Sequence, residues 1–74
     1  MKITIESTTK IVSVNGVPAR IWEGKTESGI DVHCYITRIA IDENDPRKGE
    51  FQHELMECKK PSPEIEAIPA RLIL

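Results

Sequence analysis

The chain has 74 residues, with ten basic and twelve acidic side chains and a formal net charge of −2 at neutral pH. This length predicts one domain over residues 1–74 with a small core. The charge balance argues against generic binding to nucleic acid or anionic membranes, which requires a basic excess. No apolar run approaches the roughly 20 residues of a membrane span, and residues 1–6 alternate without the apolar stretch of a signal peptide. We therefore expect a cytoplasmic protein.

Residues 1–42 predict β-structure, because Ile, Val and Thr dominate and turn-forming residues punctuate them. The alternation of polar and apolar residues indicates four strands, at residues 2–6, 10–14, 17–26 and 30–41. Residues 7–9 are expected to form a turn between the first two strands.

Asn15 and Gly16 are the clearest hairpin signal, because both tolerate the positive φ that a type I′ turn needs. Such a turn pairs Val14 with Val17, and one face of the hairpin then becomes the core face. The residues expected on it are Val12, Val14, Val17, Ala19 and Ile21. Pro18 lacks a backbone N–H and should lie at a strand end or an open edge.

A second hairpin is predicted at Ser28 and Gly29. A two-residue turn there places Ile21 opposite Ile36, and the even residues from 30 to 36 then join the same core face. A three-residue turn would reverse this parity. Beyond residue 36 the apolar positions change phase, which indicates either a bulge near residues 37–38 or a strand end covered on both faces.

A helix is predicted at residues 46–58, with Asp45 as N-cap and Pro46 at the first helical position. Its apolar stripe is expected from Phe51, Leu55 and Met56. Residues 61–70 contain three prolines and are interpreted as extended. Residues 71–74 are apolar enough to dock as a last short strand or to pair with another copy. The fold class is therefore α+β, a small antiparallel meander of three to five strands packed with one helix in the C-terminal half.

The sequence offers no recognisable catalytic arrangement. His33 and Cys34 are neighbours on a strand and point to opposite faces, and His53 and Cys58 are poorly spaced on a helix. The histidines and cysteines do not form the close ligand pairs of a zinc site. The acidic residues at 42–45 lack the glycine and spaced glutamate of a calcium loop. We therefore expect no enzyme activity, no catalytic residue, no metal site and no cofactor.

A binding surface is predicted on the face of the sheet opposite the core. In the two-residue-turn register Trp22 lies opposite Tyr35, and Arg20 lies opposite Thr37. The candidate binding residues are Arg20, Trp22, His33, Tyr35, Thr37 and Arg38. Such a cluster suits a nucleobase, a phosphate or a protein partner. The competing interpretation is a second core, formed if the predicted helix packs over Trp22 and Tyr35.

Several stretches resemble short, uncharacterised proteins encoded by bacteriophages and prophages. The stretches that carry the resemblance are residues 15–24, 27–29, 36–39 and 69–74. Such proteins have no assigned activity, so the resemblance transfers no functional residue. It implies a bacterial host cell as the location, and it favours binding over catalysis.

The leading functional hypothesis is a non-enzymatic, phage-type accessory protein that binds a host or phage protein, as an inhibitor of bacterial defence would. One alternative is a protein that sequesters a nucleotide or another small anionic ligand on the aromatic and basic face. A second alternative is a structural or assembly component, for which a homo-oligomer is expected.

Overall fold

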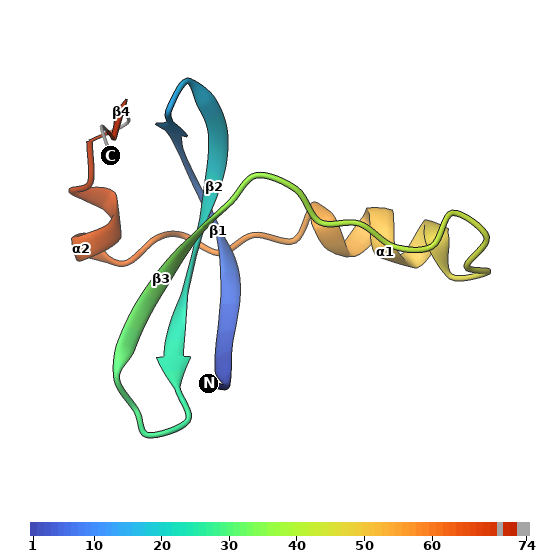
Figure 1. Ribbon diagram of the computed structural model, residues 1–74, viewed down its shortest axis with the longest axis horizontal. Coiled ribbons are helices and arrows are strands. Elements are labelled where there is room, and N and C mark those ends of the chain that lie inside the picture. Colours follow the sequence, from blue (N-terminus) through green and yellow to red (C-terminus); the bar gives the residue numbers. More distant parts are fainter. Residues whose placement is uncertain (70, 73–74) are drawn as a thin grey trace.

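The computed structural model describes residues 1–69 and 71–72 of the chain. In chain order the elements are β1 (Ile3–Val14), β2 (Val17–Thr26), β3 (Asp31–Ile36), α1 (Lys48–Leu55), α2 (Pro63–Glu66) and β4 (Arg71–Leu72). The strands form one sheet in the order β3-β2-β1-β4, as Figure 1 shows. The first three strands are an antiparallel meander, and β4 runs parallel to β1. The predicted α+β class is confirmed.

The first hairpin has the predicted turn and register. Asn15 and Gly16 have φ values of 51° and 81°, the positive values that a type I′ turn demands. Val14 pairs with Val17, as expected. Pro18 lies beyond the point where β3 ends opposite Arg20, so its missing N–H leaves no gap in the ladder.

The predicted turn at residues 7–9 is wrong, because β1 is continuous and absorbs these residues as a bulge. Ser7 pairs with Trp22 and Ile11 with Arg20, so three residues of β1 lie opposite one residue of β2. Thr8 is fully buried at this bulge, and its hydroxyl donates a hydrogen bond of 2.7 Å to the carbonyl of Ile21. The side chain thereby satisfies a backbone acceptor that the bulge leaves unpaired.

The predicted register of the second hairpin is wrong by one residue. The loop holds three residues, because the N–H of Thr26 donates to the carbonyl of Ile30 and Gly29 takes φ of 93°. Trp22 therefore pairs with Cys34, and Ile21 pairs with Tyr35. The side chains at positions 32, 34 and 36 consequently lie on the face opposite the core.

The core lies on one face of the sheet, beneath α2. Val12, Ala19 and Ile21 are buried there against Ile65 of α2. Residues 61–70 were predicted to be extended, but four of them form α2, with Pro63 in its first turn. Fixed φ and a missing N–H make proline favourable at that position. The expected final strand is confirmed for residues 71–72, which pair with β1; residues 70, 73 and 74 lie outside the described part.

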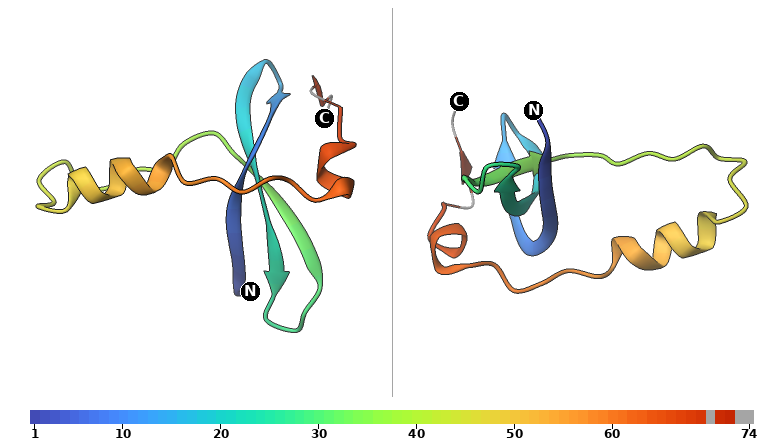
Figure 2. Two further views of the ribbon diagram at one scale, coloured as in Figure 1. Left: turned by 180° about the vertical axis from the view of Figure 1, so that it is seen from behind. Right: turned by 90° about the horizontal axis from the view of Figure 1, so that it is seen from below.

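The segment from residue 37 to residue 58, here called the arm, leaves the sheet on the side opposite α2 (Figures 1 and 2). The fourth strand was predicted to reach residue 41, but β3 ends at Ile36. The helix predicted at residues 46–58 is shorter, because α1 begins at Lys48 and ends at Leu55. Asp45 was predicted as its N-cap; instead its carboxylate accepts the N–H of Arg47 in a turn before the helix.

No residue of α1 is buried, so the face of the sheet opposite the core does not gain a covering helix. Neither helix in the described residues has the length and apolar character that crossing a membrane takes.

Candidate functional site

The six predicted binding residues lie in two places, because the hairpin loop shifts β3 by one residue relative to β2. Arg20, Trp22, Thr37 and Arg38 line a common groove on the face opposite the core. His33 and Tyr35 lie on the core face instead, since Tyr35 pairs with Ile21. The predicted contact between Trp22 and Tyr35 is therefore absent.

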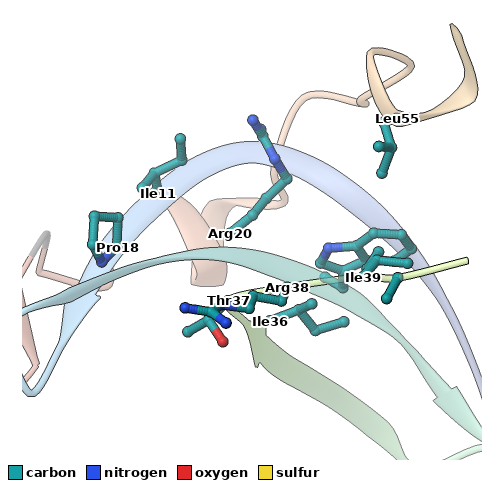
Figure 3. Close-up of a pocket in the computed structure, with 10 residues that line it drawn as sticks. Ile11, Pro18, Arg20, Ile36, Thr37, Arg38, Ile39 and Leu55 are labelled. Carbon is teal, nitrogen blue, oxygen red and sulfur yellow. The ribbon is translucent and has the colours of Figure 1, made fainter. Parts of the chain in front are cut away.

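The groove has a volume of about 490 Å³ and lies where the arm joins the sheet (Figure 3). Its floor is the outer face of the sheet, and its wall is formed by the start of the arm and by Leu55, which points from α1 toward Ile39. The lining residues are Ile11, Pro18, Arg20, Trp22, Ile36, Thr37, Arg38, Ile39, Ala40 and Leu55. Most are apolar, so the groove suits an apolar group better than an ion.

Arg20 makes a structural hydrogen bond. One terminal nitrogen of its guanidinium, Nη1, donates a hydrogen bond of 2.8 Å to the carbonyl of Thr8 in the β1 bulge. A guanidinium has further N–H donors, but this contact fixes the plane of the group against the sheet. Arg20 therefore stabilises the bulge of β1. Arg38 is exposed and is the more accessible cation of the groove.

His33 and Tyr35 interact with each other. The His33 Nε2 and the Tyr35 hydroxyl are 3.0 Å apart, and the two rings meet edge to face with centroids 5.4 Å apart. Tyr35 packs against the core, whereas His33 is exposed beside Glu23 and Lys59. This pair closes one side of the core, and it does not extend the groove.

The arm leaves several apolar side chains partly exposed. Ile39, Ile41 and Leu55 are 41%, 36% and 42% exposed, and Met56 is 83% exposed. An apolar stripe of this kind on a projecting segment is typical of an interaction surface. The change of hydrophobic phase at Ile39 and Ile41 was the sequence signal for it, although that change was interpreted as a strand bulge or as a strand end covered on both faces.

The arm also concentrates negative charge. It carries six acidic and three basic side chains, a formal charge of −3, whereas the other residues carry seven basic and six acidic ones, a formal charge of +1. Arg47 and Glu50 form a two-pronged ion pair with N···O distances of 2.8 and 3.1 Å, which lowers the pKa of the Glu50 carboxyl. Arg47 thus offsets the charge of Glu50 locally, and the remaining acidic side chains give the arm its negative formal charge.

Comparison with protein-family models, with curated proteins and with solved structures found no match. The chemistry of the groove and the arm is therefore the basis for a functional assignment.

Proposed function

We propose that this chain is a non-enzymatic accessory protein of phage type that uses its arm to bind another protein. The observation that carries the proposal is that α1 buries none of its residues while the arm exposes Ile41, Leu55 and Met56. Exposing apolar side chains on a projecting segment costs free energy that a partner's surface recovers.

The chemistry of the arm defines the partner surface. An apolar stripe surrounded by acidic side chains fits an apolar recess flanked by Lys or Arg. The resemblance to phage-encoded proteins supports a bacterial host protein, such as a defence component, as the target. The groove adds Trp22 and Arg38 at the base of the arm, residue types that often anchor protein interfaces.

The nucleotide-binding alternative has less support from this geometry. The expected cluster of aromatic and basic groups is divided between two faces, and Arg20 is held by the bulge. An acidic arm beside the groove also repels an anionic ligand.

The test compares quantitative capture from a bacterial lysate by the wild type, Leu55→Ser and Ile30→Ser. Ile30 is the matched control because it is 64% exposed and directly follows the three-residue loop between β2 and β3, at a distance from the arm in the sequence. We expect a specific set of captured proteins that Leu55→Ser loses and Ile30→Ser retains. A photo-crosslinking residue at position 56 should label the same proteins. Equal capture by both variants, or no capture by folded protein, contradicts the proposal, and quenching of Trp22 by a nucleotide favours the alternative.

A further inference from the structure

The outer edge of β3 has backbone groups without partners among the described residues. β3 is the outermost strand of the sheet, and its ladder bonds go to β2 alone. The N–H of Thr26 donates to the carbonyl of Ile30, so the even-numbered residues of this strand face β2. Val32, Cys34 and Ile36 therefore direct their N–H and C=O groups toward β2. The alternate residues Asp31, His33 and Tyr35 therefore direct these groups outward.

This edge lacks the protection that other edges of the sheet have. The outer edge of β1 is occupied by Lys59, which bonds to Ser7 and Thr9, and by β4. On β2, Pro18 lies where β3 has ended. Within β3 the sequence Asp-Val-His-Cys-Tyr-Ile contains no Pro and no Lys, and its one carboxylate, Asp31, lies at the first residue and pairs with Lys25. The rest of this edge, from Val32 to Ile36, is therefore a template for a further strand.

The small core indicates that this chain gains stability from a further source. Only Val12, Ala19, Ile21 and Ile65 are buried apolar residues in the described part of the chain. A domain of this size commonly needs a disulfide, a metal or self-association to be stable. Cys34 and Cys58 are free thiols, which leaves association as the available contribution within the described residues.

We propose that β3 pairs antiparallel with β3 of a second copy, about a twofold axis that passes through Cys34. The two three-stranded meanders then form one continuous sheet across the dimer. In this register His33 lies opposite Tyr35 of the second copy and bonds to it through the outward backbone groups. Val32 lies opposite Ile36 of the second copy on the other face, so both pairs match in character.

The hydrogen-bond pattern and the side chains select this register. Because the outward groups belong to odd-numbered residues, a twofold axis must pass through a residue rather than between two. An axis through His33 opposes two histidines and places Asp31 against Tyr35. An axis through Tyr35 opposes Val32 to Arg38. Of these three axes, only the one through Cys34 gives the apolar pair of Val32 with Ile36 and the pair of His33 with Tyr35, and it opposes no like charges.

This register has a chemical signature. Cys34 would face Cys34 of the second copy as a non-hydrogen-bonded pair, where Cα atoms are about 4.5 Å apart. A disulfide needs Cα atoms about 4.4–6.8 Å apart, so the two thiols are placed to cross-link. With diamide as oxidant, the two thiols lose two protons and two electrons to form the S–S bond, and diamide becomes the corresponding hydrazine.

The first experiment measures this cross-link in the full chain. Cys58→Ser retains only Cys34 and should form a covalent dimer with diamide, reversed by dithiothreitol. Cys34→Ser retains only Cys58 and should cross-link about tenfold more slowly, because Cys58 does not lie at the proposed axis. A cross-link that forms equally in both variants overturns the proposed register.

The second experiment measures self-association without oxidant. Light scattering should show a dimer for the wild type. His33→Pro removes one outward N–H and should weaken dimerisation by about tenfold or more, whereas His33→Thr, which keeps the N–H, should retain it. Should His33→Pro fail to fold, hydrogen exchange on the wild type decides, because the amides of His33 and Tyr35 must be protected. A wild-type monomer at high concentration, or rapid exchange at both amides, overturns the proposal.

The edge of β3 adjoins the groove at Ile36, but the exposed apolar residues of the arm and the backbone groups of His33 and Tyr35 share no residue. Leu55→Ser should therefore reduce capture of a partner and leave dimerisation unchanged. His33→Pro should weaken dimerisation and leave the exposed apolar residues of the arm unchanged. The two proposals therefore fail independently.

Discussion

The carboxylate of Glu23 accepts a hydrogen bond of 3.0 Å from the backbone N–H of Ser62, and this contact ties the sheet to the segment that covers it. Lys59 supports the contact, with its Nζ 3.4 Å from the other carboxylate oxygen. Glu23 lies on the core face of β2, and Ser62 directly precedes α2. The Glu23 side chain thus contacts both Lys59 and Ser62, the two ends of the segment that leads to Ile65 in the core.

This contact makes stability depend on pH. The Ser62 N–H lowers the pKa of Glu23 most strongly, burial opposes it, and Lys59 adds to the lowering. A carboxyl whose pKa is lower in the folded state stabilises the fold above its unfolded pKa, and this contribution is lost as pH falls through the folded pKa. We expect the stability difference between wild type and Glu23→Gln to be present at neutral pH and to disappear below the ordinary value of 4.5.

Urea unfolding at a series of pH values measures this difference. Glu27→Gln is the control, because Glu27 is exposed in the β2–β3 loop and its replacement should leave the profile unchanged. A difference that is independent of pH would show that the charge of Glu23 does not contribute.

Ile65 should carry a large share of the stability, because it is the one residue of α2 in the core and is 5% exposed. Ile65→Ala removes three carbon atoms from a buried site, and we expect a loss of about 2–5 kcal/mol in the free energy of unfolding. Ile30→Ala removes the same atoms from a site that is 64% exposed, and it should cost less than about 0.5 kcal/mol. Chemical denaturation checks both, and equal losses would contradict the placement of α2.

Gly24 should not tolerate a side chain. A Cβ at this position would overlap the backbone carbonyl of Thr4 on β1, so the strands would have to move apart. We expect Gly24→Ala to cost about 1–3 kcal/mol. Gly49 in α1 is the matched control, since a Cβ there meets nothing within 4 Å, and Gly49→Ala should stabilise the helix by up to about 1 kcal/mol. Thermal unfolding should therefore shift in opposite directions for the two variants.

The sequence was informative where a local signal determines the structure. Asn15 and Gly16 specify their turn through φ, so the register of the first hairpin was predicted correctly. Of the residues expected on its core face, Val12, Ala19 and Ile21 are buried, whereas Val17 at the turn is 49% exposed. At Ser28 and Gly29 the glycine fits either a two-residue or a three-residue loop, and the pattern of apolar residues alone does not distinguish them. Because side chains alternate along a strand, the one additional loop residue places Tyr35 on the core face instead of the predicted binding surface.

The other differences arise from long-range contacts. Thr8 is polar and lies within the run that was predicted as a turn, but its burial depends on the Ile21 carbonyl and on the segment at Lys59, 51 residues later along the chain. Ile65 lies between prolines, which hid the one turn of helix that buries it. The apolar stripe predicted for α1 favoured packing onto the sheet, whereas α1 buries no residue and Leu55 reaches only the wall of the groove. Local pattern gave the elements, and contacts distant in sequence decided where they pack.

Arg20 gives a final distinction between a binding role and a structural one. Its Nη1 donates to the Thr8 carbonyl at 2.8 Å, so its loss leaves a half-buried acceptor of the bulge without its partner. We expect Arg20→Ala to lower the free energy of unfolding by about 1–2 kcal/mol. Lys25→Ala is the control, because Lys25 pairs with Asp31 where both side chains are exposed, and its unfolding midpoint should equal that of the wild type.

Arg38→Ala completes this comparison, because Arg38 lines the same groove but is exposed at the start of the arm. Its replacement should leave stability unchanged and reduce capture of a protein partner. Chemical denaturation and quantitative capture, measured on the same three variants, separate the two roles. If Arg20→Ala is as stable as Lys25→Ala, the hydrogen bond to Thr8 does not hold the bulge, and Arg20 becomes available for binding.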